Sequence, residues 1–262
     1  MPYSLGFITD VAMRRMEGAT VTRRDGYQVI STAANPRFWW GNFILLDAPP
    51  APGSSGAWLD RFAAEFPAAE HVALGIDTTD MDAPVPDEFA AAGFSDDRSV
   101  VLTATEAADP PHPSVGVQVR PLSSDADWRQ AAELSMRITE EEGGTPDPVF
   151  HAARASARRE LAGRGHGTWF GAFDDGHLLG QLGLFRVGDG YARYQDVATA
   201  ASARRRGIAG TLVCHAARYG LDTLAVKRLV IIAEQDGPAI AVYRACGFTD
   251  TEGQVSLSRP PE

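Results

Sequence analysis

The stretch that decides the fold is Arg204-Arg205-Arg206-Gly207-Ile208-Ala209-Gly210-Thr211, which leads into the apolar-periodic segment 212–219. Three cations, a glycine and small residues at the start of a helix form a cradle for an anion, because the first helical turn offers unpaired N–H groups and the positive end of the helix dipole. Residues 191–199, just upstream, are rich in aromatic and β-branched residues and predict a strand. The order of strand, basic loop and helix therefore predicts a phosphate site.

A second segment carries a pattern of its own, and it runs Asp236-Gly237-Pro238-Ala239-Ile240-Ala241-Val242-Tyr243-Arg244-Ala245-Cys246-Gly247-Phe248. Together the two segments resemble the GCN5-related N-acetyltransferase (GNAT) family, whose signatures are Arg/Gln-x-x-Gly-x-Gly/Ala and Asn-x-x-Ala-x-x-x-Tyr-x-x-x-Gly-Phe. Arg204, Gly207 and Ala209 match the first signature. The second is matched except that Asp236 stands in place of the asparagine. The resemblance covers about residues 115–262.

The resemblance implies an α/β (α+β) fold, in which a mixed, mostly antiparallel sheet is flanked by helices. Hydrophobic periodicity and turn residues predict a compatible order of elements. In the second half we expect strand 115–120, helices 124–141 and 147–162, strands 168–173, 178–187 and 191–198, a helix to residue 220, strand 228–233, helix 237–246 and strand 255–258. In the first half we expect helices 7–17, 57–66 and 86–92 and strands 20–22, 27–31, 38–46, 71–76 and 99–104.

The first half of the chain repeats the second at an offset of 154 residues. Segment 89–96 aligns with 243–250, and loop 50–56 aligns with the basic loop so that Gly53 falls on Gly207. The first copy has Pro-Ala-Pro where the second has three arginines, and Phe89 where the second has Tyr243.

We therefore expect two tandem acyl-CoA N-acyltransferase (GNAT) domains. Residues 1–106 would be a degenerate GNAT-like copy, residues 107–114 a proline-rich linker, and residues 115–262 the catalytic domain that binds acetyl-CoA. The alternative for residues 1–106 is an unrelated α/β domain with a coincidental Gly-Phe pair.

The resemblance also implies which residues bind acetyl-CoA. The backbone of Val197, Ala198 and Thr199, at a splay in the strand, would hold the acetyl carbonyl and the pantetheine, and the N–H groups from residue 205 to 210 would hold the pyrophosphate. At Gly207 a Cβ would keep the pyrophosphate away from the backbone. The cofactor-binding candidates are Val197, Ala198, Thr199, Arg204, Arg205, Arg206, Gly207, Ile208, Ala209, Gly210, Thr211, Asp236 and Ala239.

Direct transfer to an amine needs a base for the amine proton, donors for the oxyanion and an acid for the leaving thiolate. By resemblance, Tyr243 would be the acid, because a tyrosine with a pKa of about 10 stays protonated at neutral pH. The alternative for Tyr243 is packing at the end of a helix. The candidate bases are Glu234, at the end of a buried strand, and Asp196, beside the acetyl site, and a chain of waters is the alternative to both.

Three consecutive glutamates, Glu140, Glu141 and Glu142, lie between the first two helices of the second half, where the family binds acceptors. They predict either recognition of the acceptor or a solvated helix end.

Composition and charge limit the partners. The chain has 262 residues, of which 44% are hydrophobic and 22% charged, as in a soluble globular protein. The net charge is −10, and residues 1–106 hold seven arginines against fifteen acidic residues, which argues against nucleic acid and is compatible with a cationic acceptor. An apolar run of about 18 residues and a signal-peptide pattern are both lacking, so we expect a cytoplasmic location and no membrane partner. One lysine against 23 arginines suggests a GC-rich bacterial genome.

Cysteines and histidines indicate neither a disulfide nor a metal site. Cys214 and Cys246 both lie in apolar helical patterns and are expected to be buried thiols. The six histidines show no ligand spacing, so no metal is implied. No serine or cysteine stands in a nucleophile-elbow context, which agrees with direct transfer without an acyl-enzyme.

The sequence therefore predicts an N-acetyltransferase that moves an acetyl group from acetyl-CoA to the primary amine of a small molecule, as a monomer or homodimer. The alternatives are a non-catalytic acyl-CoA-binding or regulatory module, and an acyltransferase that uses a longer acyl donor.

Overall fold

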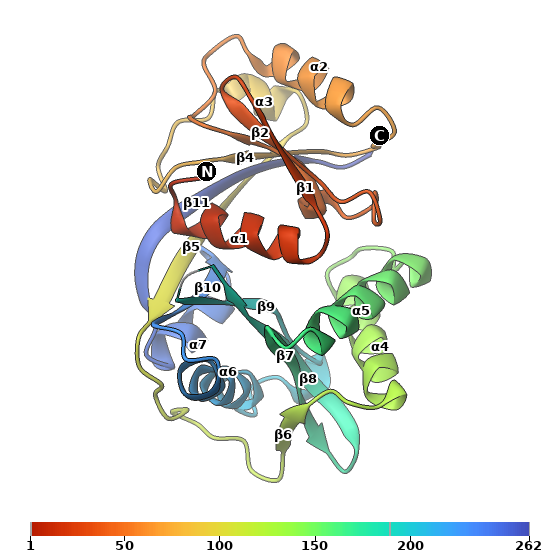
Figure 1. Cartoon of the computed structure of the whole chain (residues 1–262), viewed down its shortest axis with the longest axis vertical. Helices are drawn as coiled ribbons and strands as arrows, with labels where there is room; N and C mark the ends of the chain where they lie inside the picture. Colours follow the sequence, from red (N-terminus) through yellow and green to blue (C-terminus); the bar gives the residue numbers. More distant parts are fainter. Residues whose placement is uncertain (1, 189, 262) are drawn as a thin grey trace. The chain divides into compact units, whose positions relative to one another are not determined.

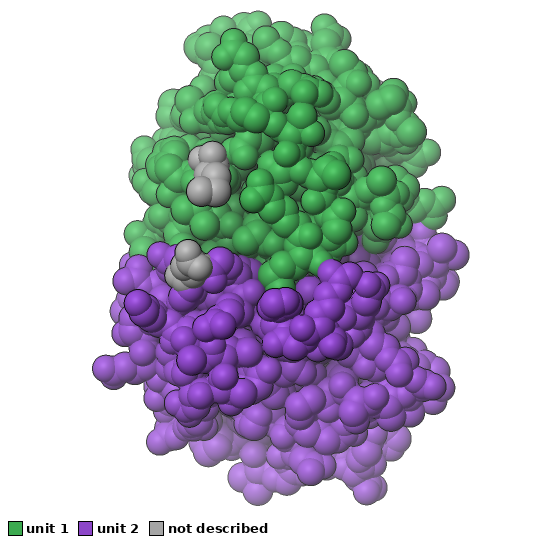
Figure 2. Space-filling model, in the orientation of Figure 1, with its two compact units in different colours: residues 1–101, 232–237, 251–262 green, residues 102–231, 238–250 purple. Residues whose placement is uncertain are grey.

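The computed structural model describes residues 2–188 and 190–261, and the chain divides into two compact units, coloured separately in Figure 2. Unit 1 comprises residues 1–101, 232–237 and 251–262, and unit 2 comprises residues 102–231 and 238–250. Both units are therefore discontinuous in sequence. The domain boundaries expected at residues 106 and 115 were drawn from the sequence repeat, whereas the two units are defined by compactness in space. Those boundaries therefore stay a prediction.

Unit 1 is a mixed sheet with helices on both faces (Figure 1). Its strand order is β1-β2-β3-β4-β11-β5; β3 and β4 are parallel, whereas β1–β2, β2–β3 and β4–β11 are antiparallel. The expected turn at Asp25 and Gly26 joins β1 to β2, with a φ of +81° at the glycine. The elements are α1 (Leu5–Met16), β1 (Thr20–Arg24), β2 (Tyr27–Ser31), η1 (Trp39–Gly41), β3 (Asn42–Leu46), α2 (Ser55–Glu65), β4 (Val72–Ile76), α3 (Asp87–Ala91), β5 (Ser95–Ala104) and β11 (Thr249–Arg259).

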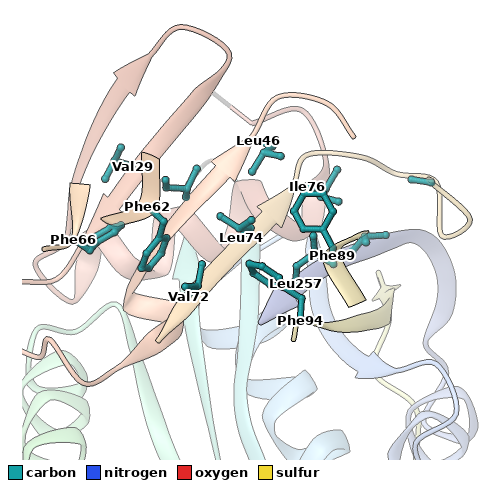
Figure 3. Packing of buried hydrophobic residues seen from close by; sticks show 13 residues of the cluster. Val29, Leu46, Phe62, Phe66, Val72, Leu74, Ile76, Phe89, Phe94 and Leu257 are labelled. Atoms are coloured by element: carbon teal, nitrogen blue, oxygen red, sulfur yellow. The ribbon is translucent and has the colours of Figure 1, made fainter. Parts of the chain in front are cut away.

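Strand alternation builds two cores in unit 1. Ile44 and Leu46 of β3 belong to a cluster with Phe62 of α2 and Phe89 of α3, which Figure 3 shows together with Leu74 of β4. On the other face, Phe43 and Leu45 of β3 pack with Phe7 and Val11 of α1 and with Ile30 of β2. Burial of each such side chain stabilises the fold by about 1.5–3 kcal/mol.

The strands of unit 2 follow the order β5-β10-β9-β8-β7-β6, with both parallel and antiparallel pairs. β6–β7, β7–β8 and β8–β9 are antiparallel, and β9 and β10 are parallel. The expected hairpin joins β7 to β8 through Asp175, whose φ is +47°, and Gly176, whose φ is +78°. The elements are β6 (Gln118–Pro121), α4 (Asp125–Glu141), α5 (Pro148–Gly163), β7 (Gly167–Asp174), β8 (His177–Val187), β9 (Tyr191–Thr199), η2 (Ala201–Ala203), α6 (Ile208–Arg218), η3 (Tyr219–Thr223), β10 (Arg228–Glu234) and α7 (Ala239–Ala245).

Helices cover the two faces of the unit 2 sheet in different ways. At Gly180 a Cβ would lie 3.0 Å from Ile208 of α6, whereas the side-chain amide of the next residue, Gln181, donates from Nε2 to the carbonyl oxygen of Ala131 in α4 at 3.2 Å. Because successive side chains point to opposite faces of a strand, α6 lies on one face and α4 on the other. α5 packs beside α4 and against β7.

The expected fold class is confirmed. Predicted α-helices and strands agree with the observed ones in number and order, but several bounds differ. β5 and β11 are much longer than expected, since they begin at Ser95 and Thr249. Two predicted strands begin later: residues 39–41 of the predicted strand 38–46 form η1, so β3 begins at Asn42, and β6 begins at Gln118 where a strand from residue 115 was expected. The C-terminal helix is shorter, because α7 runs only from Ala239 to Ala245. Within the residues that the structure describes, none of the helices combines the length and the apolar character that crossing a bilayer requires.

The elements of the two halves follow the same order at the offset of 154 residues. α2, β4, α3 and β5 begin within about two residues of the positions that this offset predicts from α6, β10, α7 and β11. The pairing also agrees, since β2–β3 and β8–β9 are antiparallel while β3–β4 and β9–β10 are parallel. In the sheet of unit 1, however, β11 from the end of the chain pairs with β4.

Candidate active site

A bulge interrupts β9 at Asp196. The pairing of β8 with β9 shifts between Gln181 and Gly183, where β9 has one residue more than β8, and Asp196 has a φ of +44°. Two residues earlier, the Tyr194 hydroxyl donates a hydrogen bond to the carbonyl oxygen of Val213 in α6. Asp196 instead contacts α5, so the bulge turns its side chain to the opposite face of the sheet.

Beyond the bulge, Val197, Ala198 and Thr199 form the half-buried end of β9. β9 pairs with β10 over three residues, 191–193, and residues 198 and 199 pair on the opposite side with β8. The hydroxyl oxygen of Thr199 is buried without a hydrogen-bond partner among the described residues. Because buried hydroxyls are normally paired, this atom would suit a polar group of a bound molecule.

The basic loop follows β9 and ends at the first turn of α6. Gly207 is the N-cap, with a φ of +75°, and Arg205 also has a positive φ, +61°. Ile208, Ala209 and Gly210 form the first turn, whose N–H groups are those that a helix leaves unpaired. The hydroxyl of Thr211 donates a hydrogen bond to the carbonyl oxygen of Gly207 at 2.9 Å and so closes this turn. The basic loop therefore leads into a helix start at Gly207, and binding of an anion there stays a prediction.

Two of the three arginines make ion pairs within unit 2. Arg204 lies 2.5 Å from the carboxylate of Glu141 at the end of α4 and donates from Nε to the carbonyl oxygen of Thr199 at 3.3 Å. Arg206 lies 3.0 Å from the carboxylate of Asp174 at the end of β7. These pairs are exposed and therefore weak, so a phosphate can replace the carboxylates at little cost.

Part of the segment expected as a linker lies against this loop. A Cβ on Gly207 would lie 2.0 Å from the carbonyl oxygen of His112, and the N–H of Ser114 donates to the hydroxyl of Thr211 at 2.9 Å. Asp109 pairs with Arg218 of α6. We call residues 109–114 the strap. The absence of a side chain at Gly207 is thus required by the strap, whereas the sequence suggested the pyrophosphate as the reason.

Tyr243 lies in α7 and is only 4% exposed. Burial, followed by the nearby Cys246 thiol, raises its pKa above the ordinary value for tyrosine, so the phenol stays protonated at neutral pH. Cys214 and Cys246 are buried free thiols, as expected, and Cys246 contacts the carbonyl oxygen of Gly210 at 3.7 Å. The hydrogen bond with Cys214 and burial raise the pKa of Cys246.

The remaining candidates fall in different parts of the chain. Glu234 and Asp236 are exposed and belong to unit 1, because the division between the units falls within β10, after Ile231; Ala239 opens α7 in unit 2. Among the described residues, no group of three or more His, Cys, Asp and Glu side chains is placed to hold a metal ion.

A buried polar network beneath the bulge was missed from the sequence. Arg154 and Arg158 of α5 are 7% and 9% exposed, and both contact the carboxylate of Asp196, Arg154 at 3.2 Å. His151, one turn earlier, is also buried, and burial and Arg158 lower its pKa. These three residues, spaced three and four apart, share one helix face with Leu161, and that spacing was the available signal.

The corresponding loop of unit 1 is closed by a side chain of its own. The carboxylate of Glu88 accepts hydrogen bonds from the N–H groups of Gly53 and Ser55, at 3.0 and 2.9 Å, at the start of α2. At the offset of 154 residues, Glu88 corresponds to Val242. The carboxylate that accepts from the loop N–H groups in unit 1 is thus replaced by the apolar side chain of Val242 at the corresponding position of the second half.

Comparison with known proteins agrees with this geometry. Residues 128–248 match the model of the Acetyltransferase (GNAT) family, a match that supports acyl transfer as the general reaction. A search of the curated proteins found no match.

Several solved structures resemble the chain along most of its length. A GCN5-related N-acetyltransferase from Kribbella flavida is 15% identical, with a TM-score of 0.64 over 99% of this chain and 98% of that one. A functionally unknown conserved protein from Staphylococcus epidermidis is 10% identical, with a TM-score of 0.65 over 92% and 93%. A tandem GNAT protein from the clavulanic acid biosynthesis pathway is 16% identical, with a TM-score of 0.54 over 88% and 77%. At these identities the likeness concerns the fold alone.

Proposed function

Because residues 128–248 match the model of the Acetyltransferase (GNAT) family, we propose that the chain transfers an acetyl group from acetyl-CoA to the primary amine of a small molecule. The observation that carries this proposal is the continuity of β9, the basic loop and α6. A bulged strand end with an unpaired Thr199 hydroxyl leads directly to a helix start that is capped by Gly207 and flanked by arginines.

These residues fit the two ends of the donor. The backbone of residues 197–199 would bind the acetyl carbonyl and the pantetheine, and the Thr199 hydroxyl would satisfy a polar group there. The N–H groups at the start of α6, with Arg204 and Arg206, would bind the pyrophosphate. Asp236 and Ala239 remain candidates by resemblance.

Acetyl-CoA supplies an activated thioester. The amine nitrogen forms a bond to the acyl carbon, the carbon–sulfur bond breaks, the base takes the amine proton, and Tyr243 gives its proton to the sulfur. Tyr243 is suited to this step because burial keeps the phenol protonated.

For the base, the sequence offers Glu234 and Asp196. The Asp196 carboxylate already accepts from two guanidiniums, which leaves it poorly placed to accept an amine proton. We therefore propose Glu234 as the base. This assignment rests on its position at the end of β10.

We also propose that residues 1–106 are a degenerate GNAT-like copy that binds no acetyl-CoA. The shared order and pairing of elements at the offset of 154 residues support a duplication. Pro50, Ala51 and Pro52 supply no cations, and Glu88 already pairs with the loop N–H groups.

The test of the enzymatic proposal is Tyr243→Phe, with Tyr219→Phe of η3 as the control. We expect kcat to fall by about 100- to 10,000-fold with the acetyl-CoA Kd nearly unchanged, because only the proton donor is lost. Phe89 occupies the corresponding position of the first half, so phenylalanine can pack in such a place. Equal turnover of Tyr243→Phe and wild type would rule out Tyr243 as the acid, whereas no turnover of any amine by wild type would favour a non-catalytic acyl-CoA-binding module.

A further inference from the structure

The bulge of β9 is held from α5. Asp196 has a positive φ, which costs most non-glycine residues conformational energy, although Asp tolerates it better than most. Its carboxylate contacts the guanidiniums of Arg154 and Arg158, which lie one helical turn apart on the buried face of α5. The ion pairs therefore join Asp196, the residue of β9 with a positive φ, to α5, which packs against the sheet.

Arg158 is itself fixed by other groups. Its guanidinium lies 4.6 Å from the centre of the Trp169 ring in β7, and Nη1 lies 3.4 Å from the hydroxyl of Ser135 in α4. Its Nε is buried without a hydrogen-bond partner among the described residues. An arginine held in this way has one principal ionic contact, the carboxylate of Asp196.

The facing strand is held by the same network. Gln181 of β8 pairs with Ala198, on the far side of the bulge. Its side chain is 1% exposed, accepts from the indole N–H of Trp169 at 3.1 Å and donates to the hydroxyl of Ser135 at 3.0 Å. Both sides of the bulge are thus tied to α4 and α5, through Asp196 on β9 and through Gln181 on β8.

We propose that Arg154 and Arg158 are positioning residues for acyl transfer: through Asp196 they hold the bulge of β9, and with it the backbone of residues 197–199, in the shape that binds the acyl donor. This inference rests on the proposed function. It gives Asp196 the role of an anchor. Arg154 and Arg158 touch neither donor nor acceptor in this account.

The experiment compares Arg158→Met and Asp196→Asn with Arg159→Met. Arg159 is the next residue of α5, but it is exposed and pairs with the exposed Asp125, so its substitution removes the same charge without touching the bulge. In Arg158→Met and Asp196→Asn, the Kd and KM for acetyl-CoA should rise by about 10- to 100-fold, because small displacements of binding groups are costly. Arg159→Met should match the wild type.

Asp196→Gly separates backbone shape from the ion pair. Glycine adopts a positive φ freely, so this variant keeps the geometry of the bulge available and removes only the carboxylate. If the ion pairs hold the bulge, Asp196→Gly is as impaired as Asp196→Asn. Wild-type affinity in Asp196→Gly would overturn the inference.

Two further readouts distinguish positioning from catalysis and from general destabilisation. Without any ligand, hydrogen exchange in a peptide covering residues 195–200 should accelerate in Arg158→Met but not in Arg159→Met, and equal exchange would overturn the inference. In Asp196→Asn the acidic limb of the kcat/KM profile against pH should remain, and its loss with an unchanged KM would make Asp196 the base. If wild type fails to bind acetyl-CoA, the proposed function falls and the inference with it; if wild type binds and Arg158→Met binds equally well, only the inference falls.

Discussion

Glu141, at the end of α4, holds the guanidinium of Arg204 in the basic loop at 2.5 Å. The glutamate belongs to the run for which the sequence predicted either recognition of the acceptor or a solvated helix end, and the arginine belongs to the loop predicted to bind the pyrophosphate. In this structure Glu141 and Arg204 form an ion pair with each other. The pair is exposed, with 52% of the arginine side chain accessible, so exchange of the carboxylate for a phosphate is inexpensive.

We predict that Glu141→Gln tightens acetyl-CoA binding, because Arg204 no longer has to leave a carboxylate. The expected decrease in Kd is about 2- to 5-fold, the size of a weak surface pair. Calorimetric titration measures it, and Glu142→Gln is the control, since that exposed neighbour removes the same charge. A Kd that changes equally in both variants would show a general charge effect and contradict the specific exchange.

Gly207→Ala should destabilise the protein more than Gly53→Ala. Both glycines have a positive φ, +75° and +81°, so the backbone strain of about 1–2 kcal/mol is common to the two variants. Only at Gly207 would the new Cβ meet the strap, at the carbonyl oxygen of His112, whereas at Gly53 nothing lies within 4 Å. Thermal unfolding of both variants measures the difference, and equal losses would mean that the strap yields freely.

Asp127→Asn should weaken the start of α4 in a manner that depends on pH. Asp127 pairs with Arg120 at 2.7 Å, and the N–H groups of Ser123 and Ser124 donate to the same carboxylate. These contacts, first the hydrogen bond from Arg120, hold the pKa of Asp127 well below its usual value. The stabilisation is therefore present above the unfolded-state pKa of about 3.9 and is lost as the pH falls through the folded-state pKa.

At pH 7 we expect Asp127→Asn to lower the free energy of unfolding by about 2–3 kcal/mol, from the lost cap and the partly buried ion pair. The difference from wild type should shrink when denaturation is repeated below about pH 4. Asp125→Asn, in the same helical turn but exposed, should cost far less. A difference that stays constant with pH would contradict the assigned pKa shift.

Much of the fold could be predicted because local signals agree with it. The turn residues at positions 25–26 and 175–176 predicted two hairpins that the structure contains. The sequence did not predict the first residues of strands β5 and β11. Residues 95–97 and 249–251 are exposed and polar, so they show no alternation of apolar side chains. The pairing of β11 with β4 was also unreadable, because strand partners are chosen in space and leave no local signal.

The candidate site was predictable where backbone geometry leaves a signature in sequence. Gly207 and the residues around it are such a case, since a positive φ and a helix start both constrain residue type. Arg154 and Arg158 are the opposite case. On a helix, arginines predict a solvated face, whereas here the Asp196 carboxylate, 38 or more positions away in sequence, compensates their buried charge.

The most direct test of the account is calorimetric titration of acetyl-CoA into wild type, into Arg204→Ala/Arg206→Ala and into the control Arg23→Ala/Arg24→Ala, which removes two arginines of β1 in unit 1. We predict one site per chain in wild type, the same site in the control, and a Kd raised by about 10-fold or more in the loop variant, because two phosphate contacts are lost. Two sites in wild type, equal weakening in both variants, or no binding at all would contradict the account.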